Sequence, residues 1–211
     1  MSIENPSETL EKIHEAAKKE FLKKGFAAAS LRHIVKAAGV TTGAFYGYYS
    51  SKEKLFDALV EKQAAHVLRH IDGAIKAFQN LSGDEQTRKM KEVSGSETAY
   101  LTEYIFSNRD AFKLLILCAE GTKYDDFVHR LAVRETESSF AYMEAMRREG
   151  IPLKPVNNKL MHIIASGFYT AVFETIVHDM SMEDAKEYLQ QLEHFYTAGW
   201  EELLGVKFGE S

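Results

Sequence analysis

Apolar residues recur at spacings of three and four along most of the chain, a pattern that predicts helices. Leu10, Ile13, Ala17 and Phe21 form one such stripe, in a segment that starts near Pro6-Ser7 and stops at Gly25. No segment shows the apolar–polar alternation of a half-buried strand, and three prolines in 211 residues permit long helices. We therefore expect an all-α fold.

Two short helices follow the first one closely. Ser30 can cap a helix that ends at Gly39, a residue suited to a left-handed C-cap. Thr41 can cap the next helix, from Thr42 to about Tyr48, and Ser50-Ser51 breaks it. Short helix, glycine turn and short helix together predict a helix-turn-helix at about residues 30–49, whose second helix normally enters the major groove. A fourth helix is expected from Lys52 through about residue 78.

The second short helix is unusually rich in aromatic residues. Phe45 and Tyr49 lie four residues apart, so they share a face and can anchor the helix to a core. Thr42 and Tyr46 share another face, where a threonine or tyrosine hydroxyl can reach phosphates or base edges. Gly43 would let the backbone approach DNA closely.

Two further residues of this region, Thr41 and Tyr48, are expected near the exposed side of the motif. Lys52 offers a positive charge at a helix N-terminus, a combination suited to a phosphate.

Charge is divided unevenly along the chain, although the net charge is only -5. Residues 1–60 contain nine Lys/Arg against seven Asp/Glu, whereas residues 61–211 contain seventeen against twenty-four. A basic N-terminal part on an acidic remainder is typical of a nucleic-acid-facing end, and a solvated helix surface would explain it equally well.

The stretch SLRHIVKAAGVTTGAFYGYYSSKEKLFDALV resembles the DNA-binding region of the TetR/AcrR family of transcriptional regulators. The resemblance covers about residues 7–67, which we expect to form the DNA-binding domain. It implies the following DNA contacts: Arg32, Thr41, Thr42, Gly43, Tyr46, Tyr48 and Lys52. Gly47 and Tyr48 depart from the bulkier and His-type residues frequent in the family, so the operator sequence does not transfer.

Residues 68–211 are expected to form a larger helical domain. The polar, glycine-containing stretch 80–96 predicts a loop or irregular connection, and RDAFKLLILCAEG predicts a central apolar helix. Three long helices are expected at about 125–148, 157–178 and 182–204.

The resemblance implies that the last two helices form a four-helix bundle with their symmetry mates in a homodimer. Small Ser166 and Gly167 would allow close approach, and the predicted interface helix carries several apolar residues: Ile163, Ile164, Ala171, Phe173 and Ile176, with Glu174. Burial within one chain remains an equal alternative from the residues alone.

The resemblance also implies an apolar small-molecule pocket in this domain. The helices expected to line it carry His66, Tyr104, Cys118, Phe127 and Phe168. Each of these side chains is individually more typical of an ordinary core residue.

Enzymatic and membrane functions find no support in the sequence. No phosphate-binding glycine loop or nucleophile elbow occurs, no cofactor is indicated, and no third ligand completes the Asp125/His129 or His178/Met182 pairs as a metal site. A single cysteine, a polar N-terminus without a signal peptide and the lack of an 18-residue apolar run favour a cytoplasmic protein.

The sequence thus favours a ligand-responsive transcriptional regulator, with a repressor as the preferred interpretation. A homodimer would bind a palindromic double-stranded DNA operator, and an unidentified small-molecule effector would release it. The alternative is a helical small-molecule-binding or interaction protein without DNA-binding output.

Overall fold

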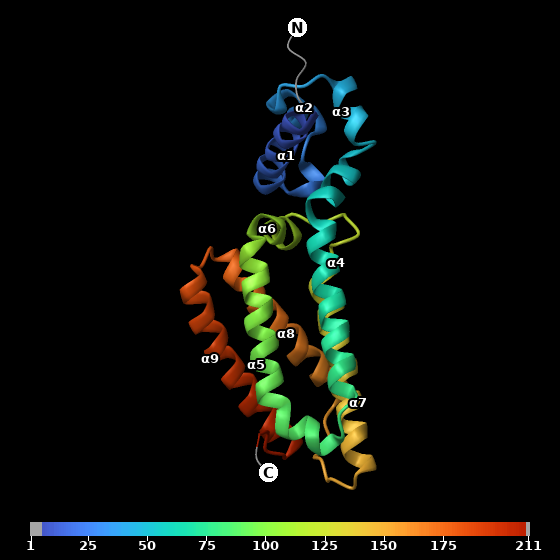
Figure 1. Ribbon diagram of the computed structural model, residues 1–211, viewed down its shortest axis with the longest axis vertical. Helices are drawn as coiled ribbons and strands as arrows, with labels where there is room; N and C mark the ends of the chain where they lie inside the picture. Colours follow the sequence, from blue (N-terminus) through green and yellow to red (C-terminus); the bar gives the residue numbers. More distant parts are fainter. Residues whose placement is uncertain (1–5, 210–211) are drawn as a thin grey trace. The chain divides into compact units, whose positions relative to one another are not determined.

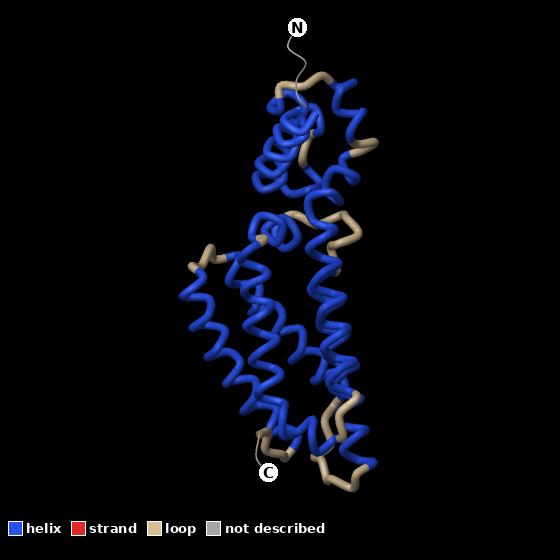
Figure 2. The backbone as a smooth tube through the Cα atoms, viewed as in Figure 1, coloured by secondary structure: helices blue, strands red, loops and turns tan. Residues whose placement is uncertain are grey.

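The computed structural model describes residues 6–209, and within this range it contains only helices, loops and turns (Figures 1 and 2). This bears out the all-α expectation. The helices are α1 (Pro6–Ala28), α2 (Leu31–Ala38), α3 (Thr42–Tyr48), α4 (Lys52–Gln79), α5 (Gly83–Ser107), α6 (Arg109–Leu117), α7 (Phe127–Arg148), α8 (Asn158–Val177) and α9 (Met182–Leu204).

The chain forms two compact units. Unit 1 contains the residues up to Ala65 together with Asn108–Phe127, and unit 2 contains His66–Ser107 and the chain from Val128 onwards. The division inside α4 lies two residues from the expected boundary at 67/68. The larger difference is that α6 and the loop after it join unit 1 instead of the C-terminal domain.

Unit 1 is organised around aromatic packing. Phe21, Phe26 and Phe56 meet with ring centroids 5.2–5.9 Å apart, and α1 packs against both α2 and α6. Gly25 interrupts the helical backbone of α1 at φ 72°, where the sequence predicted its end. The chain then continues as one last turn to Ala28, so Gly25 marks a kink inside the assigned helix.

The stretch 80–96 is expected to hold a loop or irregular connection, and this connection covers only residues 80–82, because the N-terminal half of α5 occupies the rest. Ser82 Oγ accepts from the Glu85 backbone N–H at 3.2 Å, while the Glu85 carboxylate accepts from the Ser82 N–H at 3.1 Å, which is a capping box. Glu149 adds a cap from α7's end by accepting from the N–H groups of Gly83 and Asp84 at 2.6 and 3.0 Å. These partners satisfy orphan donors of the first turn and start a helix in a polar sequence.

The glycines of this stretch serve close packing. A Cβ on Gly83 would lie 3.0 Å from the Glu149 carboxylate, and one on Gly95 would lie 3.2 Å from Glu193 Oε1. Both glycines therefore let a carboxylate from another helix approach the α5 backbone, and neither marks a break in it.

Unit 2 contains the long helices at nearly the predicted positions. Its buried residues include a cluster in which α7 and α8 meet the C-terminal end of the chain: Tyr142, Met143, Met146, Met161, Leu204 and Phe208. The α9 helix packs against α5 and α8 (Figure 1).

Apolar residues of α8 divide between two faces. Phe173 and Ile176 are buried in the monomer, which supports intrachain burial for these two, whereas Ile163 is 65% exposed. By length and composition alone α8 could cross a membrane, but a core helix of a soluble protein passes the same test.

Candidate nucleic-acid interface and internal cavity

Local caps fix the two short helices of unit 1. Ser30 Oγ accepts from the His33 N–H at 3.4 Å, and Gly39 closes α2 in the left-handed conformation at φ 70°. Thr41 Oγ1 accepts from the Ala44 N–H at 3.1 Å and starts α3. These caps confirm the predicted helix-turn-helix spacing and set the direction in which α3 leaves the turn.

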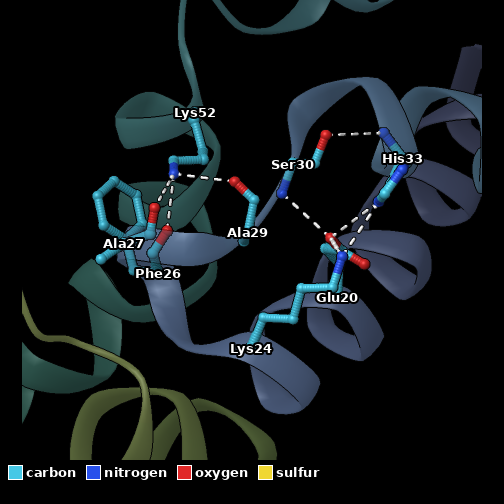
Figure 3. A network of polar contacts seen from close by, with 8 residues as sticks. All are labelled: Glu20, Lys24, Phe26, Ala27, Ala29, Ser30, His33 and Lys52. Atoms are coloured by element: carbon cyan, nitrogen blue, oxygen red, sulfur yellow. Dashed lines mark hydrogen bonds and ion pairs between the residues drawn. The ribbon is translucent and has the colours of Figure 1, made fainter.

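Glu20 ties the start of α2 to α1 (Figure 3). Its carboxylate accepts from Lys24 Nζ at 2.8 Å and from the Ser30 backbone N–H at 3.1 Å, and it lies 3.5 Å from His33 Nδ1. The hydrogen bond from Lys24, and then that from Ser30, lowers the pKa of Glu20. This contribution to stability is present above the ordinary pKa of a glutamate and is lost as pH falls through the lowered value.

Helix α3 is anchored on one side and open on the other. Phe45 is fully buried, and Tyr49 is half-buried with its hydroxyl 2.5 Å from His14 Nε2. Tyr46 is 53% exposed, and Thr42 and Gly43 beside it are exposed as well. A Cβ built on Gly43 would meet nothing within 4 Å, so nothing within the chain requires glycine there. This face is thus available to an outside partner.

The other predicted DNA contacts differ in how available they are. Thr41 and Arg32 are exposed, although the Thr41 hydroxyl also caps α3. Tyr48 is exposed by 37%, but its hydroxyl donates to the Pro6 carbonyl at 3.1 Å and so ties α3 to the start of α1.

Lys52, which the sequence predicts to contact a phosphate, does not extend outward in this structure. Its ammonium donates to the carbonyl oxygens of Phe26, Ala27 and Ala29 at 2.7, 3.3 and 3.0 Å, and it lies 4.4 Å from the Phe26 ring centroid (Figure 3). An ammonium group has three donors, and the end of α1 engages all three. Lys52 therefore completes the C-terminal end of α1, where a cation is favourable.

Replacing Lys52 with methionine is expected to destabilise the protein, because three carbonyls lose a charged donor while the apolar stem is kept. One hydrogen bond to a charged group contributes roughly 1.5–3 kcal/mol. Thermal unfolding measured by circular dichroism should show a lower Tm. The exposed Lys54, whose ion pair with Asp57 is long at 3.6 Å, provides the control Lys54→Met, with little change in Tm.

Sequence reasoning missed Lys36. It lies four residues after Arg32 on α2, is exposed like Arg32, and so shares its face. The i, i+4 spacing of two basic residues was the signal that could have found it. The first helix of a helix-turn-helix crosses the DNA backbone, where such a pair suits phosphates.

Unit 2 contains a partly open cavity of about 220 Å³ between α4, α5, α7, α8 and α9. Its wall is largely apolar and aromatic, with Phe168, Tyr169, Tyr196 and Trp200 from α8 and α9. Of the five residues predicted for a pocket, Phe168 lies in this wall.

The remaining four predicted pocket residues lie elsewhere. His66 and Tyr104 stack on each other at 4.0 Å between ring centroids on α4 and α5, one position away from the lining residues Val67 and Ile105. Cys118 and Phe127 are buried in unit 1. Burial raises the pKa of the Cys118 thiol to about 11, which makes it a poor nucleophile.

Comparison with known proteins bears on the helix-turn-helix. Residues 13–59 match the family described as bacterial regulatory proteins, tetR family. This match spans α1 to α4 and includes both caps described above. Residues 13–59 therefore form a region of the tetR family of bacterial regulatory proteins.

Curated transcriptional regulators are similar to part of the chain. An uncharacterized HTH-type transcriptional regulator of Bacillus subtilis, YvdT, is 36% identical over 115 residues, which are 54% of this chain and 53% of that protein. The HTH-type transcriptional repressor AcnR of Corynebacterium efficiens is 27% identical over 85 residues, 39% of this chain and 45% of that protein. The chain thus spans about half the length of the curated relatives it matches.

A solved structure extends the similarity of fold. The crystal structure of a gamma-butyrolactone receptor described as ArpA-like has a TM-score of 0.58 and 19% identity, covering 92% of this chain and 88% of that one. At this identity the comparison shows similarity of fold alone, so the ligand of the cavity has to be inferred from the cavity's own residues.

Proposed function

We propose that the protein is a homodimeric, ligand-responsive transcriptional regulator that represses by occupying a palindromic DNA operator. The observation that carries this is α3, which Phe45 anchors while Thr42, Gly43 and Tyr46 stay exposed. Helical proteins that only bind small molecules have no need of such a face. The relative named as a repressor supports repression over activation.

We place the predicted DNA contacts in two groups. Arg32, Lys36, Thr41, Thr42, Gly43 and Tyr46 are proposed to reach DNA directly, since all are exposed. Tyr48 and Lys52 are proposed to act by positioning, because their polar groups bind the chain's own backbone. This assignment replaces the direct phosphate contact expected for Lys52.

A dimer is proposed to form through the exposed apolar surface of α8 and α9. Its large members, which we call the outer stripe, are Leu160, Ile163 and Val177 on α8 and Phe195 on α9. Gly167 is also exposed on α8 and would permit close helix approach. A helix-turn-helix protein that binds a palindromic site needs a dimer to reach half-sites about 34–36 Å apart. The proposed DNA binding therefore also favours a dimer.

The cavity in unit 2 is proposed to hold the effector. Helix α4 begins in unit 1 at Lys52 and contributes Val67 and Ile71 to the cavity wall in unit 2. A ligand that favours another arrangement of α4 would shift the population away from the DNA-binding form. The shift can be no larger than the ligand's preference for that form. We propose a cytoplasmic location and no catalytic role, in line with the family.

Selection of bound fragments from random duplex DNA tests this function with the full-length protein. We expect an inverted repeat with half-sites about one helical turn or a small multiple apart. Recovery of no sequence above the non-specific background would favour a binding protein without DNA output and would falsify the regulator assignment.

A further inference from the structure

The charges in the cavity wall all have one sign. Glu97 of α5, Glu135 of α7 and Glu193 of α9 line it together with apolar and hydroxyl side chains. No Lys, Arg or His belongs to this lining within the described residues. An otherwise apolar cavity therefore has a strongly negative character.

Glu135 is the most deeply placed of the three carboxylates. Glu135 is surrounded by protein, is only partly accessible and belongs to the cavity lining. Burial raises the pKa of Glu135, and the Tyr169 hydroxyl is the donor that opposes this rise. The neighbouring Arg134 offers no compensation, since its guanidinium bonds Asp72 of α4 at 2.6 Å. A buried carboxylate without a cation is costly to a folded protein.

Glu193 presents a second carboxylate of this kind. It lies against the α5 backbone, where Gly95 leaves the necessary space. Burial raises its pKa as well, and His194 opposes the rise only from a distance. Glu97 differs from the other two, because His70 Nε2 lies 2.6 Å from its Oε2 and can serve as its partner.

Aromatic rings complete the wall around these carboxylates. Phe168 and Tyr196 meet edge-to-face with centroids 5.1 Å apart, and Trp200 also lines the cavity. A Cβ on Gly167 would lie 3.0 Å from the Tyr196 hydroxyl, so glycine at this position lets the hydroxyl approach the α8 backbone. Ring faces attract organic cations, and apolar rings accept their hydrocarbon parts.

We propose that the cavity binds a lipophilic organic cation, an amine or quaternary ammonium with an apolar body, whose charge is met by Glu135 and Glu193. This rests on the proposed function in taking the cavity as the effector site. The cation would supply a positive charge to these two carboxylates, since the described residues of the cavity lining include no Lys, Arg or His. An anionic ligand would instead meet repulsion from all three glutamates, and a neutral one would leave them uncompensated.

Three probes with one common body separate these cases: (4-phenylbutyl)trimethylammonium, neutral 5-phenyl-1-pentanol and anionic 5-phenylpentanoate. Calorimetric titration of the full-length dimer should give at least tenfold tighter binding of the ammonium than of either other probe. Trp200 is the only tryptophan of the chain and lines the cavity, so its fluorescence should change with the same affinity. Equal binding of the alcohol, or tighter binding of the carboxylate, would overturn the proposal.

A substitution locates the charge recognition. Glu135→Gln keeps an acceptor for the Tyr169 hydroxyl and removes the charge, so ammonium affinity should fall at least tenfold while alcohol affinity stays within a factor of two or three. Glu137→Gln, on the exposed side of the same helix, is the matched control and should leave both affinities unchanged. Ammonium affinity unaffected by Glu135→Gln and by Glu193→Gln would contradict the assignment.

Protonation provides a separate readout. Because burial raises the pKa of Glu135 and Glu193, each holds its proton to a higher pH than an exposed glutamate does. The wild-type protein should thus bind the ammonium more weakly as pH falls from 8 to 5, whereas alcohol binding should stay nearly constant. A flat ammonium profile over this range would count against carboxylate recognition.

The same substitution should raise stability in the absence of ligand. A carboxyl whose pKa is higher in the folded than in the unfolded chain opposes folding above its ordinary pKa, and the opposition fades at lower pH. We expect Glu135→Gln to raise Tm by a few degrees at pH 8 and by less at pH 5, as measured by circular dichroism. A lower Tm at both pH values would show that Glu135 has a structural partner in the empty protein.

Operator binding distinguishes failure of this inference from failure of the proposed function. If the selected DNA binds but no cation does, the cation proposal falls and the regulator stands. If the ammonium binds in the cavity without changing operator affinity, the ligand class stands and the effector role is lost.

Discussion

Replacing Tyr46 with alanine is expected to lower operator affinity by about 10- to 100-fold, with little change in Tm. A base or phosphate contact is worth roughly 1–3 kcal/mol, and each 1.4 kcal/mol corresponds to a tenfold change. Tyr46 is 53% exposed, and its ring meets the Phe45 ring edge-to-face, with centroids 5.5 Å apart. The stability of the fold therefore depends little on this side chain. The operator would contact it in both protomers of a dimer.

The measurement is a fluorescence anisotropy titration of labelled operator at several salt concentrations, beside thermal unfolding of the same samples. Tyr46→Phe separates the hydroxyl from the ring, since it should lose part of the affinity if the hydroxyl donates to DNA. Arg32→Ala should reduce the steepness of the salt dependence, because it removes a charge that displaces counterions. Full operator affinity in Tyr46→Ala would place the recognition surface away from α3.

Charges introduced into the outer stripe are expected to produce a monomer with at least 100-fold weaker operator binding. Ile163 is 65% and Phe195 74% exposed in the chain, so glutamate at both positions is compatible with the monomer fold. In a two-fold interface each substitution appears twice, and desolvated like charges would face one another. Loss of the dimer removes one of the two half-site contacts.

Analytical ultracentrifugation of Ile163→Glu/Phe195→Glu at micromolar concentration measures the oligomeric state. Leu22→Glu is the control, because Leu22 is also an exposed large apolar residue, at 42%, but lies on α1. It should leave the dimer intact. A double variant that sediments as a dimer would show that these two side chains lie outside the interface.

The helix-turn-helix could be predicted because its determinants are local. Ser30, Gly39 and Thr41 act within three or four residues of their own positions, so sequence order alone carries the signal. The split of Phe45 and Tyr46 between buried and exposed faces follows from helical spacing in the same way.

Other features depend on residues far apart in the chain. The position of Lys52 at a helix start predicts an outward side chain that binds an anion. In the structure its ammonium binds the end of α1 instead, 24 residues earlier in the sequence. The start of α5 relies on Glu149, more than 60 residues away, in addition to the local Ser82–Glu85 box that the sequence reasoning overlooked.

The sequence predicts some of the helices that line the cavity, but not which residues of those helices face it. His66 and Tyr104 lie on two of the right helices, but each is one residue from a lining position. Helical periodicity gives relative faces within one helix, and the packing of several helices decides which face borders a cavity. The acidic residues of the wall lie on three different helices, so no local sequence pattern predicts that they meet at one cavity.

The rate at which the Cys118 thiol reacts can measure how often unit 1 opens. Cys118 is 2% exposed, its carbonyl accepts from the Phe26 N–H at 2.9 Å, and it is the only cysteine of the chain. A thiol-specific reagent can react only when local unfolding uncovers this sulfur, so its labelling rate would report the free energy of that opening. Operator DNA, by binding the closed form, would slow the reaction in proportion to its occupancy, without any engineered label.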